Sequence, residues 1–342
     1  MRACGMMHRM RHRLHACLCG LVALLAAAAT PATELQLDAG GETLFGELKS
    51  VTTRRSDTLI ELARQYSLGY EEITRVNPRV DPWLPGEGTE VLLPLQRILP
   101  AGFRKGIVIN LAEHRLYYFV PEADGSARRV LTFPVSIGKM DWRTPLGMTR
   151  IVEKRANPVW IPPSSVRAEH AARGDPLPAQ VPAGSDNPLG AFALRLGIPG
   201  GSYLIHGTNN PAAVGMAVTH GCIRMYPEDV EKLFALVPVG TQVVLTNEPL
   251  KVLFHRGEIW LEVHPPVDAQ GATTMPNVSD LEPRLNALLG AAPAAIYWDA
   301  AKQALAEARG IPTLIGLEVD SDPSGQLQNN YNMPTAPGIW RW

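Results

Sequence analysis

The spacing of apolar residues over 43–97 predicts a small unit with two helices between two strands. The residues Ser56-Asp57-Thr58 are potential helix N-caps. They are followed by apolar residues at helical spacing: Leu59, Leu62, Ala63 and Tyr66. A second, shorter helix is expected around Tyr70 and Ile73, before Pro78, and 91–93 reads as a strand. This order describes a compact α+β module.

From Gly106 onward the hydrophobic period becomes two, which predicts strands. Residues 107–110 and 115–120 flank a tight turn and predict a hairpin. Further strand-like segments lie at 130–137, 148–152, 191–196, 202–205, 242–245 and 259–263. One clear helix is predicted over 227–236, where Val230, Leu233 and Phe234 form an apolar face. The pattern therefore predicts a mainly antiparallel β domain that carries one helix.

A long proline- and alanine-rich insertion, residues 156–190, interrupts this β pattern. Connections of this length inside a compact domain are typically lids or binding loops, and otherwise disordered. We expect a lid, with disorder as the alternative.

The pattern changes again after about residue 268. Apolar residues at helical spacing predict two helices, over 281–289 and 298–308, and 313–315 predicts a strand. A polar, flexible tail is expected from residue 321. The C-terminal part therefore reads as a helical or mixed accessory region, and nothing in its sequence indicates chemistry.

The N-terminus has the features of a secretory signal peptide. Four arginines precede the apolar run 16–29, which ends in small residues and is too short to span a bilayer comfortably. Cleavage is expected between Ala29 and Ala32; a retained membrane anchor is the alternative. Removing residues 1–29 takes the net charge from −1 to −5, which gives no bulk attraction to nucleic acid. The chain is 46% hydrophobic and 19% charged, which excludes wholesale disorder.

The same cleavage leaves Cys222 as the single cysteine of an exported protein. One thiol forms no internal disulfide, so it is either a small buried hydrophobe or a functional group. Its neighbours favour function, because two glycine-flanked histidines lie nearby in His206-Gly207-Thr208 and in Thr219-His220-Gly221-Cys222-Ile223-Arg224.

These two segments predict a nucleophilic cysteine. His206 or His220 can serve as the base, and Arg224 adds a positive charge that favours a thiolate. The period-two rule places Cys222 and Arg224 on one face of a strand, with Ile223 and Met225 toward the core. Gly221 permits a close backbone approach, so the amides of Gly221 and Cys222 are candidates for an oxyanion hole.

A zinc site is the competing interpretation of the same residues. His206, His220 and Cys222 are all potential ligands, but their spacing matches no common structural zinc motif and no fourth ligand is evident. We therefore expect neither a metal nor any other cofactor, and a purely structural role for all three residues is the least favoured interpretation.

At these residues the sequence resembles the L,D-transpeptidases of bacterial cell walls, or YkuD-type domains. The resemblance covers about 104–247 and includes, besides the two segments above, Thr144-Pro145-Leu146-Gly147, Arg167-Ala168-Glu169-His170, Val181-Pro182-Ala183-Gly184 and Val237-Pro238-Val239-Gly240. Thr219 stands where Ser is commoner in the family, and Arg224 stands where several relatives have Asn. Both residues occur within the family pattern. The chain is most similar to the Gram-negative periplasmic group that attaches the major outer-membrane lipoprotein to peptidoglycan.

The resemblance implies a multi-domain protein with a mainly-β catalytic domain, the L,D-transpeptidase β-sandwich. The expected divisions are a signal peptide (1–32), a degenerate LysM-like α+β module (43–97), the catalytic domain (104–247), an accessory region (248–320) and a flexible tail (321–342). The LysM-like module resembles a family that binds N-acetylglucosamine-containing glycans, but Ser56 stands where Gly is usual. A packing module without sugar affinity is equally open.

For the site, the resemblance implies that Cys222 is the nucleophile and His206 the general base and acid, with His220 and Gly207 orienting the pair. Cys222 would attack the meso-diaminopimelate–D-Ala bond of a tetrapeptide stem, release D-Ala and pass the acyl group from a thioester to an amine. The expected acceptor is the C-terminal lysine of the outer-membrane lipoprotein. The expected location of the protein is the periplasm. The alternatives are 3→3 cross-linking of stem peptides, simple hydrolysis, and a glycan-binding wall protein with an inactive site.

Overall fold

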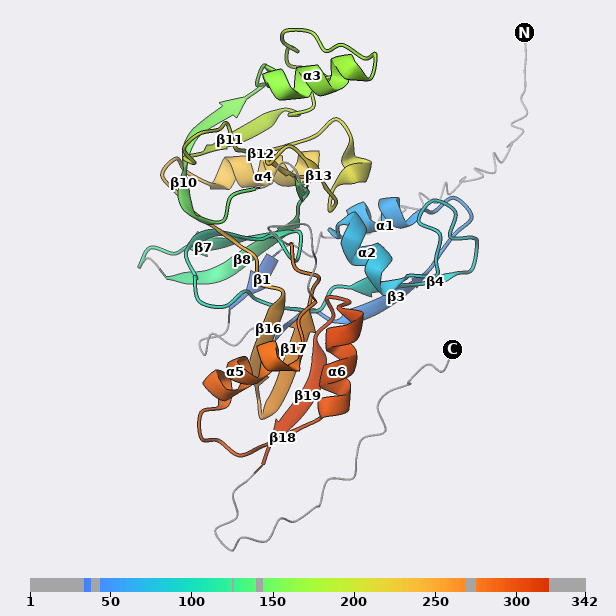
Figure 1. Cartoon of the computed structure of the whole chain (residues 1–342), viewed down its shortest axis with the longest axis vertical. Coiled ribbons are helices and arrows are strands. Elements are labelled where there is room, and N and C mark those ends of the chain that lie inside the picture. The colour runs from blue at the N-terminus through green and yellow to red at the C-terminus, as the bar shows by residue number, and fades with distance from the viewer. Residues whose placement is uncertain (1–33, 38–43, 125, 140–143, 268–274, 320–342) are drawn as a thin grey trace, which may run out of the picture. The chain divides into compact units, whose positions relative to one another are not determined.

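The computed structural model describes residues 34–37, 44–124, 126–139, 144–267 and 275–319 (Figure 1). The predicted signal peptide and the predicted tail from 321 lie outside the described residues. Within the described ranges, no helix combines the length and apolar character needed to cross a membrane. The described residues form three groups of elements: the first spans 44–98, the second 106–246 together with the strand at 34–36, and the third 250–318.

The first group has the predicted strand–helix–helix–strand order. Strand β3 (Leu48–Thr52) pairs antiparallel with β4 (Glu90–Pro94), and between them lie α1 (Leu59–Gln65) and α2 (Tyr70–Val76). The Thr58 side chain accepts from the backbone N–H of Glu61 and so caps α1. Two very short strands, β2 (Leu44–Phe45) and β5 (Arg97–Ile98), pair with each other beside this unit. Its membership of the LysM family stays a prediction.

The middle group is built on a nine-stranded sheet, which confirms the prediction of a mainly-β domain. Its strands follow the order β1 (Glu34–Gln36), β8 (Ala127–Pro134), β7 (Arg115–Pro121), β6 (Gly106–Asn110), β15 (Gln242–Thr246), β10 (Gly147–Ala156), β11 (Phe192–Leu196), β12 (Leu204–His206) and β14 (Ile223–Arg224). The pairs are antiparallel except β6–β15 and β12–β14. Strands β9 (Ile137–Gly138) and β13 (Ala217–Thr219) form a separate parallel pair, and a short 3-10 helix (Pro211–Ala213) precedes β13.

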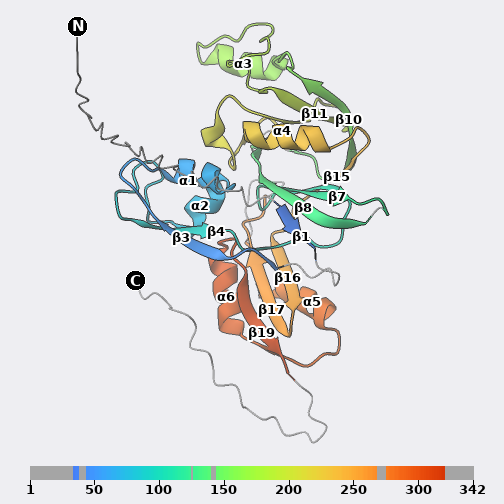
Figure 2. The same cartoon turned by 180° about the vertical axis from the view of Figure 1, so that it is seen from behind.

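Strand β10 joins two halves of this sheet. Its first residues pair with β15 and its last residues with β11, and the register to β11 shifts between Ile151 and Glu153. The two halves share one core, to which helix α4 (Pro227–Leu236) contributes the buried Val230 and Leu233. The predicted helix at 227–236 is therefore confirmed. Figures 1 and 2 show α4 and α3 (Ser164–Ala172) on opposite sides of the β10–β11–β12 half.

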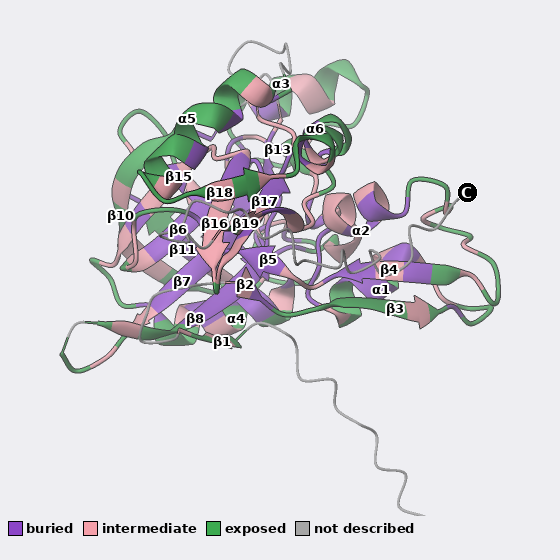
Figure 3. Cartoon of the chain, turned by 90° about the horizontal axis from the view of Figure 1, so that it is seen from below, coloured by how far each residue is buried: buried purple, intermediate pink, exposed green. Residues whose placement is uncertain are grey.

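The last group forms a separate four-stranded antiparallel sheet. Its order is β16 (Leu250–His255), β17 (Glu258–Val263), β19 (Thr313–Glu318) and β18 (Ala294–Ile296). Helices α5 (Val278–Leu289) and α6 (Trp298–Glu307) supply the buried Leu281, Leu285, Ala301 and Leu305, and most of the rest of α5 is exposed (Figure 3). The strand predicted at 259–263 is present, but it belongs to this sheet and not to the larger one.

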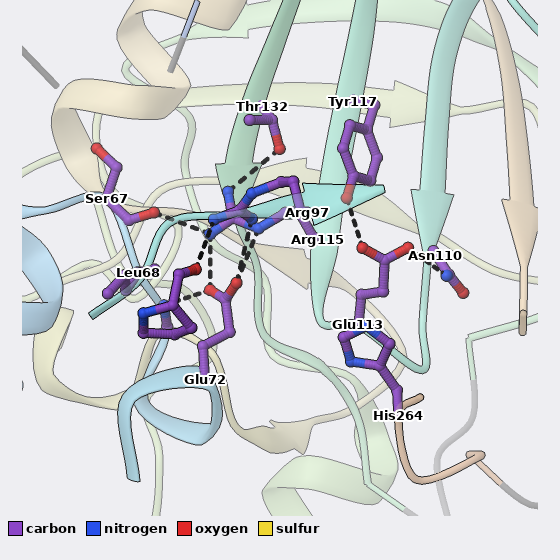
Figure 4. Close-up of polar contacts among 12 residues, drawn as sticks. Ser67, Leu68, Glu72, Arg97, Asn110, Glu113, Arg115, Tyr117, Thr132 and His264 are labelled. Atoms are coloured by element: carbon purple, nitrogen blue, oxygen red, sulfur yellow. Dashed lines mark hydrogen bonds and ion pairs between the residues drawn. The ribbon is translucent and has the colours of Figure 1, made fainter. Parts of the chain in front are cut away.

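Buried charged side chains connect the three groups. The Glu72 carboxylate of α2 accepts from Arg115 of β7 and from Arg97 of β5, at distances from 2.7 to 3.3 Å (Figure 4). The Lys251 ammonium of β16 lies 2.9 Å from Glu113 Oε2 and 2.6 Å from Glu262 Oε1. These pairs satisfy charges that would otherwise be costly to bury, so each group constrains its neighbours.

Candidate active site

The parallel pairing of β12 with β14 positions the two principal site residues. His206 lies opposite Arg224, and Ile205 lies opposite Ile223, which places Cys222 beside Leu204 one step earlier. Ile205, Ile223 and Met225 are fully buried in the core. Because side chains alternate across a strand, Cys222 and Arg224 share the other face, as predicted, and the register adds His206 to that face.

His206 is a buried, neutral imidazole with one nitrogen committed. Its Nδ1 donates to the carbonyl oxygen of Gly207 at 2.7 Å, which leaves Nε2 as the acceptor. Burial, and secondarily the Arg224 guanidinium, lower the pKa of His206 to about 4. The ring is therefore available as a base at neutral pH.

Cys222 is a protonated thiol in this arrangement. Burial raises the pKa of Cys222, and the opposing influence of the Leu204 backbone and Arg224 does not cancel it. The expected lowering of the thiol pKa by Arg224 is therefore outweighed. The Sγ atom lies 3.7 Å from the Ser202 carbonyl oxygen, and the described hydrogen bonds include none between Cys222 and His206. A thiol beside a neutral base requires proton transfer before or during attack.

The loop before Cys222 is held by two threonine hydroxyls. Thr219 Oγ1 donates to the Cys222 carbonyl at 2.6 Å, and Thr144 Oγ1 donates to the Gly221 carbonyl at 3.0 Å. Gly221 itself has φ +95°, a conformation that L-residues with a side chain rarely adopt. Both carbonyls are thereby turned toward the protein, and the oxyanion role of the Gly221 and Cys222 amides stays a prediction.

Gly207 and Arg224 complete the predicted set. A Cβ atom on Gly207 would lie 3.2 Å from Val230 Cγ1 and 3.3 Å from the Leu189 carbonyl oxygen, so glycine fits this contact best. The buried Nε of Arg224 has no hydrogen-bond partner among the described residues. It is a free donor on the face that carries Cys222.

His220 is directed toward the insertion. Its Nε2 donates to Oε2 of Glu169, on α3, at 2.9 Å, and Lys139 Nζ lies 3.2 Å from the other oxygen of that carboxylate. Hydrogen bonds from His220 and Lys139 lower the pKa of Glu169 to about 2. The contact spans 51 residues of sequence, and neither spacing nor periodicity singles out Glu169 as a partner.

The insertion contributes a wall of the cavity that Cys222 lines. This cavity has a volume of about 240 Å³, and its other lining residues are Glu153, Arg155, Pro158, Val159, Trp160, Ile161, Pro163, Leu189, Ala193, Arg195, Ser202 and Leu204. Asn187 fastens the base of the insertion, because its buried amide donates to Pro158 and its Oδ1 accepts from Leu189 N. The insertion thus lines part of the cavity that holds the thiol, and its role as a lid stays a prediction.

A different cluster brings potential metal ligands together. Among the described histidine, cysteine, aspartate and glutamate side chains, Glu113, Glu262 and His264 place ligand atoms within 4.8 Å of one another. The Lys251 ammonium contacts both carboxylates, so a cation is already present there. This cluster is an ion-pair network remote in sequence from Cys222.

Comparison with known proteins identifies the family. Residues 104–245 match the L,D-transpeptidase catalytic domain, YkuD. The probable L,D-transpeptidase YcfS of Escherichia coli is 43% identical over 235 residues, which is 68% of this chain and 72% of YcfS. The chain belongs to the L,D-transpeptidase family. The matched domain of this L,D-transpeptidase contains both motif segments, 206–208 and 219–224.

Two further relatives extend the similarity. The probable L,D-transpeptidase ErfK/SrfK of Escherichia coli is 39% identical over 259 residues, covering 75% of this chain and 81% of its own length. The probable L,D-transpeptidase YbiS of the same organism is 41% identical over 240 residues, which is 69% of this chain and 76% of YbiS. Both alignments are longer than the matched domain, so the similarity of this L,D-transpeptidase to these relatives extends beyond its catalytic domain.

Proposed function

We propose that this protein is a periplasmic peptidoglycan L,D-transpeptidase that works through a Cys222 thioester. The observation that carries the proposal is the state of His206, which is buried, neutral and bound through Nδ1 to Gly207, on the strand face that carries Cys222. Such an imidazole can accept the thiol proton at Nε2 and return it to a leaving amine. Family membership supports the choice of reaction.

The acylation half-reaction follows from these roles. His206 Nε2 takes the proton of Cys222 as Sγ attacks the carbonyl carbon at the L-centre of meso-diaminopimelate. The unpartnered Arg224 Nε and the backbone amides of Gly221 and Cys222 are the candidate donors for the developing oxyanion. When the tetrahedral intermediate collapses, the bond to D-Ala breaks and the imidazolium protonates its amine. The product is a thioester on Cys222.

In the second half-reaction an amine attacks the thioester carbonyl carbon while His206 Nε2 accepts the amine proton. The C–S bond then breaks, the imidazolium returns the proton to Sγ, and the products are an amide and the free Cys222 thiol. We propose the C-terminal lysine of the outer-membrane lipoprotein as the acceptor, with a second stem peptide and 3→3 cross-linking as the alternative. The insertion lines the same cavity as Cys222, and this supports a role for it in excluding water. Peptidoglycan stem peptides and glycan strands are the partners in either case.

Mass spectrometry of the mature protein and its products tests this proposal. The wild type is incubated with a disaccharide-tetrapeptide and a peptide that ends in lysine, and Cys222→Ala and Cys222→Ser serve as controls with folds verified by circular dichroism. We expect loss of D-Ala, an acyl adduct on Cys222 and a donor–peptide conjugate, all absent from both variants.

Each alternative has its own product. Stem dimers without the lysine conjugate would favour 3→3 cross-linking, and tripeptide alone would indicate hydrolysis. A donor left intact by a folded wild type would refute the enzyme and favour a wall-binding protein. A wild-type level of acyl-enzyme in Cys222→Ser would refute the assignment of the nucleophile.

A further inference from the structure

The strand register continues the active-site face away from Cys222. Arg195 of β11 pairs with Leu204 of β12, and Glu153 of β10 pairs with Arg195. Cross-strand partners project to the same face of a sheet, so Cys222, Leu204, Arg195 and Glu153 form a row. Adjacent strands lie about 4.8 Å apart, which places the Arg195 backbone about 10 Å from Cys222. All four residues line the one cavity.

The far end of this row carries a net positive charge. Arg195 Nε lies 3.2 Å from Glu153 Oε2, and Arg155, also in the cavity lining, contacts the other oxygen of Glu153. Two guanidinium groups thus share one carboxylate. Their side chains are 49% and 63% exposed, and ion pairs this accessible contribute little to folding stability. The group is therefore better suited to binding than to holding the fold.

The part of the cavity between the thiol and these charges is apolar. Leu204 and Ala193 lie on the strands, and Val159, Trp160 and Ile161 of the insertion add to the lining. A ligand that fits this arrangement has a reactive carbonyl at the Cys222 end, an aliphatic stem beside Leu204 and an anionic head at the arginines. Arginine pairs with carboxylates through two parallel hydrogen bonds, which adds geometric selectivity.

We propose that Arg195 and Arg155 form a carboxylate-binding subsite that determines which reactant the enzyme accepts. The inference rests on the proposed function and assigns residues to recognition within that reaction. The free D-centre of the diaminopimelate side chain has the required chemistry, because its carboxylate matches the arginines and its ammonium group matches Glu153. The α-carboxylate of a C-terminal lysine acceptor offers the same anionic chemistry, and the experiment separates these two sources.

The test compares Arg195→Gln and Arg155→Gln with wild type on two acyl donors. One donor carries meso-diaminopimelate at the third position of the stem, and the other carries lysine there and so lacks the carboxylate. Acylation of Cys222 is followed by mass spectrometry without any acceptor. Arg150→Gln is the matched control, because Arg150 is an exposed arginine of the same strand β10 and does not line this cavity.

We expect Arg195→Gln to lower the acylation rate constant per unit donor by about 10- to 100-fold on the diaminopimelate donor, the usual effect of losing a charged hydrogen bond. With the lysine donor, Arg195→Gln should lower this rate constant only slightly. Arg150→Gln should have the wild-type rate constant with both donors. A separate arm measures transfer from the preformed acyl-enzyme to a peptide ending in lysine and to its C-terminal amide. Loss confined to the free-acid acceptor would keep the subsite and assign it to the acceptor.

Equal rates for wild type and both variants in every arm, or equal losses on both donors, would overturn the subsite. These results differ from failure of the proposed function itself, in which wild-type Cys222 forms no acyl adduct with either donor. That outcome would remove the subsite together with the reaction it serves.

Discussion

Glu169 on helix α3 and His220 in the loop before Cys222 are joined by a hydrogen bond of 2.9 Å. The pair connects the tip of the insertion to the segment that carries the thiol, while Asn187 secures the base of the same insertion. Lys139 and Arg173 also lie within 4.0 Å of the Glu169 carboxylate, and the hydrogen bonds from His220 and Lys139 hold its pKa well below the ordinary value. The insertion that lines the cavity is therefore anchored at two points, Glu169 and Asn187.

Glu169→Ala is expected to raise the ratio of hydrolysis to amine transfer, because a released insertion admits water to the thioester. Shortening 164–184 should act in the same direction and more strongly. Products are quantified by mass spectrometry at a fixed acceptor concentration. Glu231→Ala, which removes an exposed carboxylate on α4, is the control. An unchanged ratio in both the point variant and the shortened protein would refute a lid.

Gly221→Ala is expected to abolish acylation while the protein still folds. Its φ of +95° costs an alanine about 1–3 kcal/mol, and relief of that strain would turn the backbone that positions Cys222. Gly200→Ala is a matched control, since Gly200 has φ +80° and open space around its Cβ position. The melting temperature should fall by a similar amount in both variants, and only Gly221→Ala should fail to form the acyl-enzyme. An active Gly221→Ala would contradict this role for the glycine.

The acid limb of kcat/KM should report His206. Since burial and Arg224 lower the pKa of this imidazole to about 4, the free enzyme keeps its base unprotonated down to about pH 5. Arg224→Gln removes the nearby positive charge, so the limb should move toward higher pH. Rates measured from pH 4 to 8 decide the matter. A wild-type limb at the ordinary histidine pKa of about 6.5 would show that the free imidazole is solvated.

Glu72→Gln should destabilise the protein by about 3–5 kcal/mol, because it leaves the buried guanidinium of Arg115 without its carboxylate. Burial raises the pKa of Glu72, but Arg115 and Arg97 together hold it below its ordinary value. The native state therefore binds fewer protons than the unfolded state in acid. This contribution is present above the unfolded pKa and is lost as the pH falls through the folded pKa. Urea unfolding at pH 7 and pH 4 should show a smaller difference between wild type and variant at pH 4.

Asp229 should have the opposite pH dependence. Burial, and then the Glu228 charge, raise the pKa of Asp229 to about 7, and its Oδ2 has no partner among the described residues. The native carboxyl keeps its proton where the unfolded chain has lost it, so stability falls as the pH rises from about 4 to about 7. Asp229→Asn removes this loss, so its free energy of unfolding should exceed that of wild type by about 2–4 kcal/mol between pH 5 and pH 8. An identical pH dependence in the two proteins would contradict the raised pKa.

Local patterns in the sequence were sufficient to predict several elements. Helix α4 follows from the spacing of Val230 and Leu233, and the core positions of Ile223 and Met225 follow from strand alternation. These features depend on residues a few positions apart, so a period in the sequence reports them directly. The strand at 259–263 was also visible, but its sheet was not, because strand pairing depends on distant segments.

The two short motifs by themselves determined the candidate chemistry of this protein, since a cysteine, a histidine and flexible glycines define what reactions are possible. The protonation states of these residues follow from the fold. The register of β12 with β14 sets His206 opposite Arg224, and burial makes Cys222 a thiol and His206 a neutral base. The same holds for Asp229, an acid in the first turn of α4 whose pKa burial raises to about 7. Protonation depends on solvent exposure and on charges brought close by folding, and the order of residues along the chain does not contain either quantity.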